Sequence, residues 1–180
     1  MEKQPIIEKS SAWVERFVIG LQLCPFAKRP FDKGLLRFEV CFEKNMEAQL
    51  VAFWKEIEQL DKVPKEEISN TILVYPNGLH DFEKYLDLYD LAERLLLDQK
   101  LNEKFQLASF HPDYQFEGTD KDDVSNYTNR SPFPFIHILR VGEVEEAINS
   151  YPNIDEVPAR NIRLLEEMGI EKIKDIIDRA

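Results

Sequence analysis

The sequence predicts an α+β or α/β fold in which helices cover a mixed sheet of about four strands. Its length of 180 residues lies within the roughly 100–200 residues of one domain, so we expect residues 1–180 to form a single compact domain. Strand-like and helical periodicities alternate along the first part of the chain, as they do where helices join neighbouring strands. Two strand-like segments then follow each other across a long polar stretch, residues 111–132, and this order favours a mixed sheet.

The first predicted helix begins at a serine cap and ends before Pro25. Ser10 or Ser11 supplies the cap, and apolar residues recur every three or four positions to about Leu23. Residues 28–34 are rich in turn formers and predict a connector rather than a regular element.

Two strands and two helices follow in alternation. Residues 37–42 alternate between apolar and polar side chains, which predicts a half-buried strand, and residues 46–60 return to helical spacing. The short, mostly apolar run 71–75 suits a central strand. The strongest helical stripe covers residues 81–98, where Asp81 is the predicted cap.

The last third of the chain contains two strands and three helices. Residues 105–110 and 133–140 are the strands on either side of the polar stretch. The helical segments cover residues 144–148, a stretch that starts near Pro158, and residues 170–177 after a cap at Gly169.

The composition is that of an acidic globular protein and excludes several classes of function. Lysine and arginine total 23 against 34 aspartates and glutamates, which gives a formal net charge of −11, and 43% of the residues are hydrophobic. Because phosphate backbones require a basic footprint, we expect no nucleic-acid partner. Six single glycines form neither a dinucleotide fingerprint nor a phosphate loop. The chain has no run of about 18 apolar residues, so we expect no membrane span.

The amino terminus and the cysteines predict a cytoplasmic location. The first residues lack the apolar stretch of a signal peptide. Cys24 and Cys41 are too few for a disulfide framework, so we expect both thiols to be free in a reducing compartment.

The polar stretch at residues 111–132 is the segment whose composition indicates a site. A loop of about 20 residues is unusual in a compact domain and is commonly functional or disordered. Tyr114, Phe116 and Tyr127 would remain hydrated in a disordered segment, and the neighbouring Asn, Thr and Ser side chains are those that build fixed turns. We therefore expect an ordered loop.

The two ends of this loop bring candidate catalytic residues together. If the flanking strands pair, His111, Arg130 and His137 could face one pocket, with His111 at the end of a strand. His137 shares an apolar strand face with Phe135 and Leu139, so it can equally be a core histidine with one satisfied hydrogen bond.

Arg130 lies among side chains that suit recognition of an anion. Its guanidinium is a fork of donors beside Asn126, Asn129 and Ser131, a mixture that fits a carboxylate or phosphate on a small ligand. The alternative is that Arg130 pairs with an aspartate of the loop and pins it.

Cys24 is a further candidate, as a nucleophile. If a new turn starts at Pro25, Cys24 lies at its amino end, where a thiolate is favoured. If Cys24 only ends the first helix, the helix dipole opposes the thiolate, and a buried, inert thiol is the alternative. Ala27 occupies the position of a resolving cysteine, which argues against thioredoxin-like chemistry. No spacing of His, Cys and Asp matches a zinc or calcium pattern.

Three motifs carry a resemblance to a known family. They are Leu23-Cys24-Pro25-Phe26-Ala27, Ser109-Phe110-His111-Pro112-Asp113-Tyr114-Gln115-Phe116, and Asn129-Arg130-Ser131-Pro132-Phe133-Pro134 with His137, Leu139 and Arg140. Together with Pro158-Ala159-Arg160-Asn161, they make the chain similar, over nearly its whole length, to the bacterial family catalogued as domain of unknown function 1415. The resemblance implies a cytosolic, single-domain bacterial protein and implies no mechanism, cofactor or catalytic residue.

The leading functional hypothesis is a small enzyme or ligand-binding protein that acts on a small anionic metabolite. In the enzymatic version His111 is the general acid or base and Cys24 a nucleophile. The substrate-binding residues would be Arg130, Asn126, Asn129, Ser131, His137 and Tyr114. The alternatives are a non-catalytic interaction module anchored by the loop aromatics and a metal-binding protein.

Overall fold

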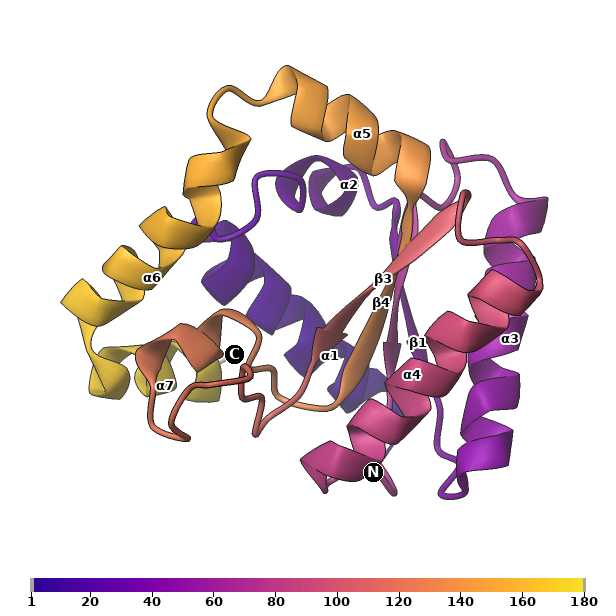
Figure 1. Ribbon diagram of the computed structural model, residues 1–180, viewed down its shortest axis with the longest axis horizontal. Helices are drawn as coiled ribbons and strands as arrows, with labels where there is room; N and C mark the ends of the chain where they lie inside the picture. The colour runs from indigo at the N-terminus through magenta and orange to yellow at the C-terminus, as the bar shows by residue number, and fades with distance from the viewer. Residues whose placement is uncertain (1, 180) are drawn as a thin grey trace.

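A single mixed sheet forms the centre of the molecule (Figure 1). The computed structural model describes residues 2–179. The strands are β1 (Leu36–Val40), β2 (Asn70–Val74), β3 (Phe105–Phe110) and β4 (Phe135–Arg140), in the spatial order β1-β2-β4-β3. β1 and β2 are parallel, whereas β4 runs antiparallel to both β2 and β3. The predicted mixed sheet of four strands is therefore confirmed.

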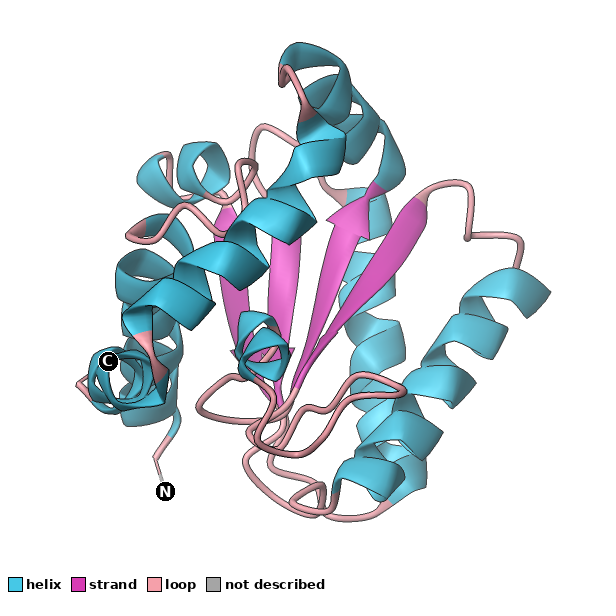
Figure 2. Ribbon diagram, turned by 60° about the vertical axis from the view of Figure 1, so that its left-hand side comes forward, coloured by secondary structure: helices cyan, strands magenta, loops and turns pink. Residues whose placement is uncertain are grey.

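Helices cover both faces of this sheet and give the molecule three layers (Figure 2). One face is covered by α3 (Met46–Lys62) and α4 (Phe82–Asp98). The other is covered by α1 (Lys3–Trp13), the π-helix η1 (Val14–Ile19), α6 (Val157–Met168) and α7 (Ile170–Asp178). The remaining helices are α2 (Lys28–Asp32), α5 (Val141–Ser150) and the 3-10 turns η2 (Val124–Thr128) and η3 (Ile154–Glu156).

The alternation of side chains along β4 divides the interior into two cores. Ile136 and Ile138 point into the core beneath α3 and α4, whereas Phe135 points into the core beneath α1 and α6. Trp13 packs edge-on against Phe135 with ring centroids 5.6 Å apart, so the first helix is attached to the centre of the sheet. β4 therefore buries apolar area on both faces, and such burial is the main stabilising contribution in a layered fold.

The prediction for the first helix is wrong at its start. The helix begins at Lys3, and Ser10 is a buried mid-helix residue whose hydroxyl donates a 2.7 Å hydrogen bond to the carbonyl of Ile6. A hydroxyl in a helix interior can be satisfied in this way, so a serine at that position is no longer a cap. Pro5 does not prevent the earlier start, because a proline is tolerated in the first turn.

The connector predicted at residues 28–34 contains the short helix α2. Lys28 and Asp32 form an ion pair at 2.7 Å across one turn, and Gly34 then takes a positive φ of 66° that ends the helix. The bounds of the helices predicted at residues 46–60 and 81–98 agree with α3 and α4 within two residues. No helix in residues 2–179 has the length and apolarity that crossing a membrane requires.

The polar loop between β3 and β4 bonds to the free edge of β3 at the carboxyl end of that strand. Because these two strands pair, the ends of the loop are neighbours. Asn129 donates from Nδ2 to the carbonyl of Ser109 at 3.0 Å and accepts the His111 amide on its own carbonyl at 3.2 Å. The loop thus supplies the hydrogen bonds that a further strand would make, which leaves less of this edge open to association.

Candidate functional site

Asn126 is the central residue of the loop and is fully buried. Its Oδ1 accepts hydrogen bonds from the Phe116 amide at 2.9 Å and from the Thr119 hydroxyl at 2.9 Å. Its Nδ2 donates to the carbonyl of Asp120 at 2.8 Å. All of these partners belong to the loop itself, so the side chain fixes the loop, and its acceptor positions are already occupied.

The side chain of His111, like that of Asn126, is fixed by hydrogen bonds within the protein. The ring is 0% exposed, and its Nδ1 accepts a hydrogen bond from the Asp113 amide at 3.0 Å. Nε2 therefore carries the proton and donates it to the carbonyl of Leu79 at 2.9 Å. Burial lowers the pKa of His111, so the ring is neutral with both nitrogens engaged. Its predicted role as a general acid or base would require one of these bonds to open.

Arg130 holds the loop through backbone carbonyls, and its contacts match neither alternative that the sequence left open. Its Nε donates to the Tyr114 carbonyl at 3.2 Å and its Nη2 to the Lys121 carbonyl at 2.6 Å. The guanidinium also lies 4.3 Å from the ring centroid of the buried Tyr127, a cation–π geometry. The arginine pins the loop, although through carbonyls rather than through aspartates.

The two remaining loop residues of the predicted site also bond within the protein. Ser131 is 3% exposed and donates from its hydroxyl to the carbonyl of Phe133 at 2.6 Å. Tyr114 packs between the rings of Phe82 and Phe116, with centroids 5.2 and 5.0 Å away. Its hydroxyl lies 3.2 Å from the Ser109 hydroxyl.

The structure does not bring the two predicted histidines together. His111 packs against Phe82 and Tyr85 of the α4 region, with ring centroids 5.1 and 5.2 Å away. His137 lies in the middle of β4, on the same face as Phe135, which belongs to the core beneath α1 and α6. The sheet therefore separates the two imidazoles.

A chain of three hydrogen bonds leads from His137 to an acidic side chain. Nε2 of His137 lies 2.8 Å from Oδ1 of Asn70. Nδ2 of Asn70 donates to the Ser69 hydroxyl at 3.0 Å, and this hydroxyl donates to Oε2 of Glu143 at 2.8 Å. Asn70 and Ser69 are buried, so the chain lies in a region of low dielectric where such bonds are strong.

The outer part of this chain lines a cleft between α2 and α5. The cleft has a volume of about 700 Å³, and its lining includes Ser69 and Asn70, where β2 begins, and Leu139, near the end of β4. Its basic residues are Arg29, Lys33, Lys65 and Arg140, and its acidic residues are Glu66, Glu143 and Glu146. This is a surplus of one basic residue on a chain whose net charge is −11.

Two of the four basic residues in the cleft are already engaged. Lys65 forms an ion pair with Glu146 at 3.0 Å. Arg140 donates to several backbone carbonyls, including those of Leu60 at 2.7 Å and Val63 at 2.8 Å. Arg29 and Lys33 are exposed, and no ion pair within residues 2–179 engages either of them.

Cys24 precedes two residues of the cleft wall, Pro25 and Phe26. Burial raises the pKa of its thiol, and backbone hydrogen bonds from Phe26 and Ala27 oppose that shift. The Ala27 amide donates to the carbonyl of Cys24 at 3.3 Å, which closes a turn after Pro25. Because burial outweighs the hydrogen bonds to the sulfur, the thiol is protonated at neutral pH, and its role as a nucleophile stays a prediction.

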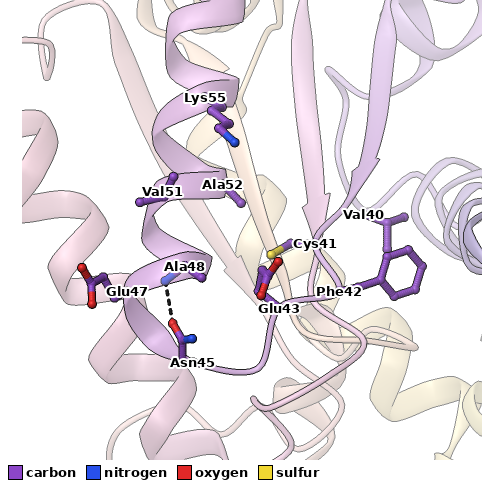
Figure 3. A pocket seen from close by; sticks show the side chains of 10 residues that line it. All are labelled: Val40, Cys41, Phe42, Glu43, Asn45, Glu47, Ala48, Val51, Ala52 and Lys55. Carbon is purple, nitrogen blue, oxygen red and sulfur yellow. Dashed lines mark hydrogen bonds between the residues drawn. The ribbon is translucent and has the colours of Figure 1, made fainter.

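A second cavity of about 660 Å³ lies where β1 ends and α3 begins (Figure 3). Cys41 points toward α3 there, and burial raises the pKa of its thiol. The charged residues of this cavity are Glu43, Glu47 and Lys55. Carboxylates outnumber the lysine, so the cavity is less suited to an anion than the cleft between α2 and α5.

Sequence patterns do not single out the residues of this cleft. Arg29, Ser69, Asn70 and Glu143 come from separate segments that only the sheet order brings together. The one signal in the sequence is the polar pair Ser69-Asn70 at the start of an otherwise mostly apolar strand. Residues 2–179 contain no group of three or more His, Cys, Asp or Glu side chains placed to hold a metal ion.

Comparison with known proteins gives a family and no described activity. The family model described as "Protein of unknown function (DUF1415)" matches residues 5–175. The comparisons with curated proteins and with solved structures found no match. Because the family model covers nearly all of the 180 residues, the chain belongs to the DUF1415 family.

Proposed function

We propose that this protein binds a small anionic metabolite in the cleft between α2 and α5. The observation that carries the proposal is the pair Arg29 and Lys33, two exposed cations without a carboxylate partner within residues 2–179. A surface charge left unpaired beside a concavity is a ready partner for a carboxylate or phosphate. The volume of about 700 Å³ lies within the range of small-molecule sites, roughly 300–1,000 Å³.

We thus propose the cleft, and not the loop, as the binding site. The predicted class of ligand, a small anion, is the same. The polar residues of the loop bond to the loop itself, which supports a structural role for Asn126, Arg130 and Ser131. The aromatic residues predicted as anchors for a protein partner pack inward, with Tyr127 only 5% exposed. We therefore propose neither an interaction module nor a metal-binding protein.

A titration with inorganic phosphate, followed by amide chemical shifts, tests this proposal. We expect the shifts to concentrate in α2, α5 and the start of β2. Replacing both cations, Arg29→Ala with Lys33→Ala, should weaken binding about tenfold or more, because a hydrogen bond to a charged group contributes about 1.5–3 kcal/mol.

The matched control replaces two exposed cations elsewhere, Arg163→Ala with Lys172→Ala, and should leave phosphate binding unchanged. Shifts centred on another surface, or equal weakening in both double variants, would contradict a site in the cleft.

We also propose a cytoplasmic location. Cys24 and Cys41 are both free thiols, which supports a reducing compartment. A bacterial origin is what the family resemblance implies.

A further inference from the structure

Charged side chains of opposite sign line the two helical walls of the cleft. Arg29 and Lys33 come from α2 and the residue that follows it, whereas Glu143 and Glu146 come from α5. No ion pair within residues 2–179 joins the two walls, although both sets of side chains line the same cavity. The cleft therefore separates charges that would attract each other in contact.

Glu143 is the carboxylate of the α5 wall that has no cationic partner. Lys65 forms an ion pair with Glu146 at 3.0 Å, whereas no ion pair within residues 2–179 includes Glu143. The residue is half-buried and lines the cleft. Its Oε2 accepts from the Ser69 hydroxyl at 2.8 Å, a neutral donor that leaves the negative charge in place.

The hydrogen bonds behind Ser69 hold this carboxylate in position. Nδ2 of Asn70 donates to the Ser69 hydroxyl at 3.0 Å, so the proton of that hydroxyl is directed at Glu143. Ser69 and Asn70 are both buried, where such bonds are strong. Because the glutamate is already oriented, a contact between its carboxylate and a ligand costs less side-chain entropy.

A ligand that carries only negative charge meets an unfavourable neighbour in this cleft. Its anionic group is attracted by Arg29 and Lys33, but the carboxylate of Glu143 repels it. A ligand that also carries an ammonium group replaces that repulsion by an ion pair, and it connects the two walls. Attraction of one ligand combined with repulsion of its competitors is how binding sites achieve specificity.

We infer that the cleft selects zwitterionic small molecules, in which a phosphate or carboxylate binds Arg29 and Lys33 and a protonated amine binds Glu143. This inference rests on the proposed function of the cleft and narrows its class of ligand. Glu143 is then a specificity-determining residue, whereas Glu146 is not, because Lys65 already neutralises its charge.

Phosphate monoesters with and without a terminal amine provide the test. The first pair is 2-aminoethyl phosphate and propyl phosphate, and the second is 4-aminobutyl phosphate and pentyl phosphate, so a methyl group replaces the ammonium in each. Two lengths are used because the ester must reach from one wall to the other. We expect the amine to tighten binding about three- to tenfold in at least one pair, since Glu143 is half-buried and its ion pair is partly screened by solvent.

Two substitutions on α5 separate a direct contact from the general charge of the protein. Glu143→Gln keeps an acceptor for the Ser69 hydroxyl and should abolish the preference for the amine, while inorganic phosphate binds at least as tightly as before. Glu145→Gln removes the same charge from an exposed residue outside the cleft lining and should preserve the preference. In the unaltered protein, the carboxyl carbon signal of Glu143 should shift with the preferred amine and not with its alkyl partner.

The outcomes distinguish this inference from the proposal on which it rests. If inorganic phosphate and all four esters fail to bind at the cleft, the proposed function is wrong. If phosphate binds at Arg29 and Lys33 but neither amine binds more tightly than its alkyl partner, the selection of zwitterions is wrong and the anion site stands. A preference that survives Glu143→Gln, or that Glu145→Gln removes equally, would overturn the role of Glu143.

Discussion

Buried amide side chains organise two separate regions of this molecule at the scale of single residues. Asn126 satisfies donors and acceptors of the loop between β3 and β4, and Asn70 joins His137 to Ser69 behind the cleft. In both cases the amide presents an acceptor on one side and donors on the other, so it can connect groups that could not bond to each other directly. Such side chains are costly to replace when buried, since their partners lose hydrogen bonds without regaining water.

The loop between β3 and β4 should lose its fixed structure when the amide of Asn126 is removed. In Asn126→Ala the Phe116 amide and the Asp120 carbonyl lose their partner, and we expect the free energy of unfolding to fall by about 2–3 kcal/mol. Urea denaturation measures the change. The exposed Asn102 offers the control, and Asn102→Ala should alter stability by less than about 0.5 kcal/mol. Equal effects of the two substitutions would show that Asn126 does not hold the loop.

His137 should make the protein less stable in mild acid. Burial lowers the pKa of His137 from 6.5 to about 4. Below about pH 6.5 the unfolded chain binds a proton that the folded ring does not, so this contribution to stability falls as the pH drops from about 6.5 to about 4. His111, whose pKa burial also lowers, acts in the same direction.

Unfolding free energies at pH 7 and pH 5 measure this effect. For His137→Gln we expect the loss of stability between these two values to be smaller than in the wild type by about 1.5–2 kcal/mol. The same loss in both proteins would mean that the folded state accepts the proton as readily as the unfolded chain does.

At the scale of elements, a tyrosine hydroxyl takes the place of a direct backbone hydrogen bond between β3 and β4. Tyr85 of α4 accepts the Phe110 amide at 2.9 Å and donates to the Phe135 carbonyl at 2.6 Å. The hydroxyl thus connects the covering helix to the last residues that these two strands share. Tyr75, at the end of β2, is equally buried, yet its hydroxyl has no partner within residues 2–179.

These two tyrosines form a matched pair for mutagenesis. Tyr85→Phe leaves a backbone donor and a backbone acceptor unsatisfied, so we expect a loss of about 2 kcal/mol in the free energy of unfolding. Tyr75→Phe removes an unpaired polar atom and should leave stability unchanged or raise it. If Tyr75→Phe is the more destabilising of the two, this assignment of the hydroxyl groups is wrong.

The elements are largely predictable from sequence because their hydrophobic patterns are local. The strong stripe at residues 81–98 and the cap at Asp81 predict α4, and Asp81 does accept the Lys84 amide at 3.1 Å. The first helix is less predictable, since Ser10 can either cap a helix or bond back to the preceding turn, and only tertiary packing of Ile6 selects the second. The bonds of Asn126 and Arg130 go to loop carbonyls, whose positions no residue pattern specifies.

At the scale of the whole molecule, the order β1-β2-β4-β3 decides where a ligand can bind. The start of β2 lies beside the end of its antiparallel neighbour β4, and α2 and α5 lie near this junction (Figure 1). The order also places His137 and His111 on opposite faces of the sheet, which no reading of the linear sequence reveals. Because the chain carries a net charge of −11, a cleft with a surplus of basic groups stands out electrostatically from the rest of the surface.

The most direct test is a crystal structure of the protein with saturating inorganic phosphate. The phosphate should lie against Arg29 and Lys33 in the cleft between α2 and α5. A phosphate bound instead beside Arg130, with the loop opened around His111, would contradict the cleft as the binding site and return the function to residues 111–132.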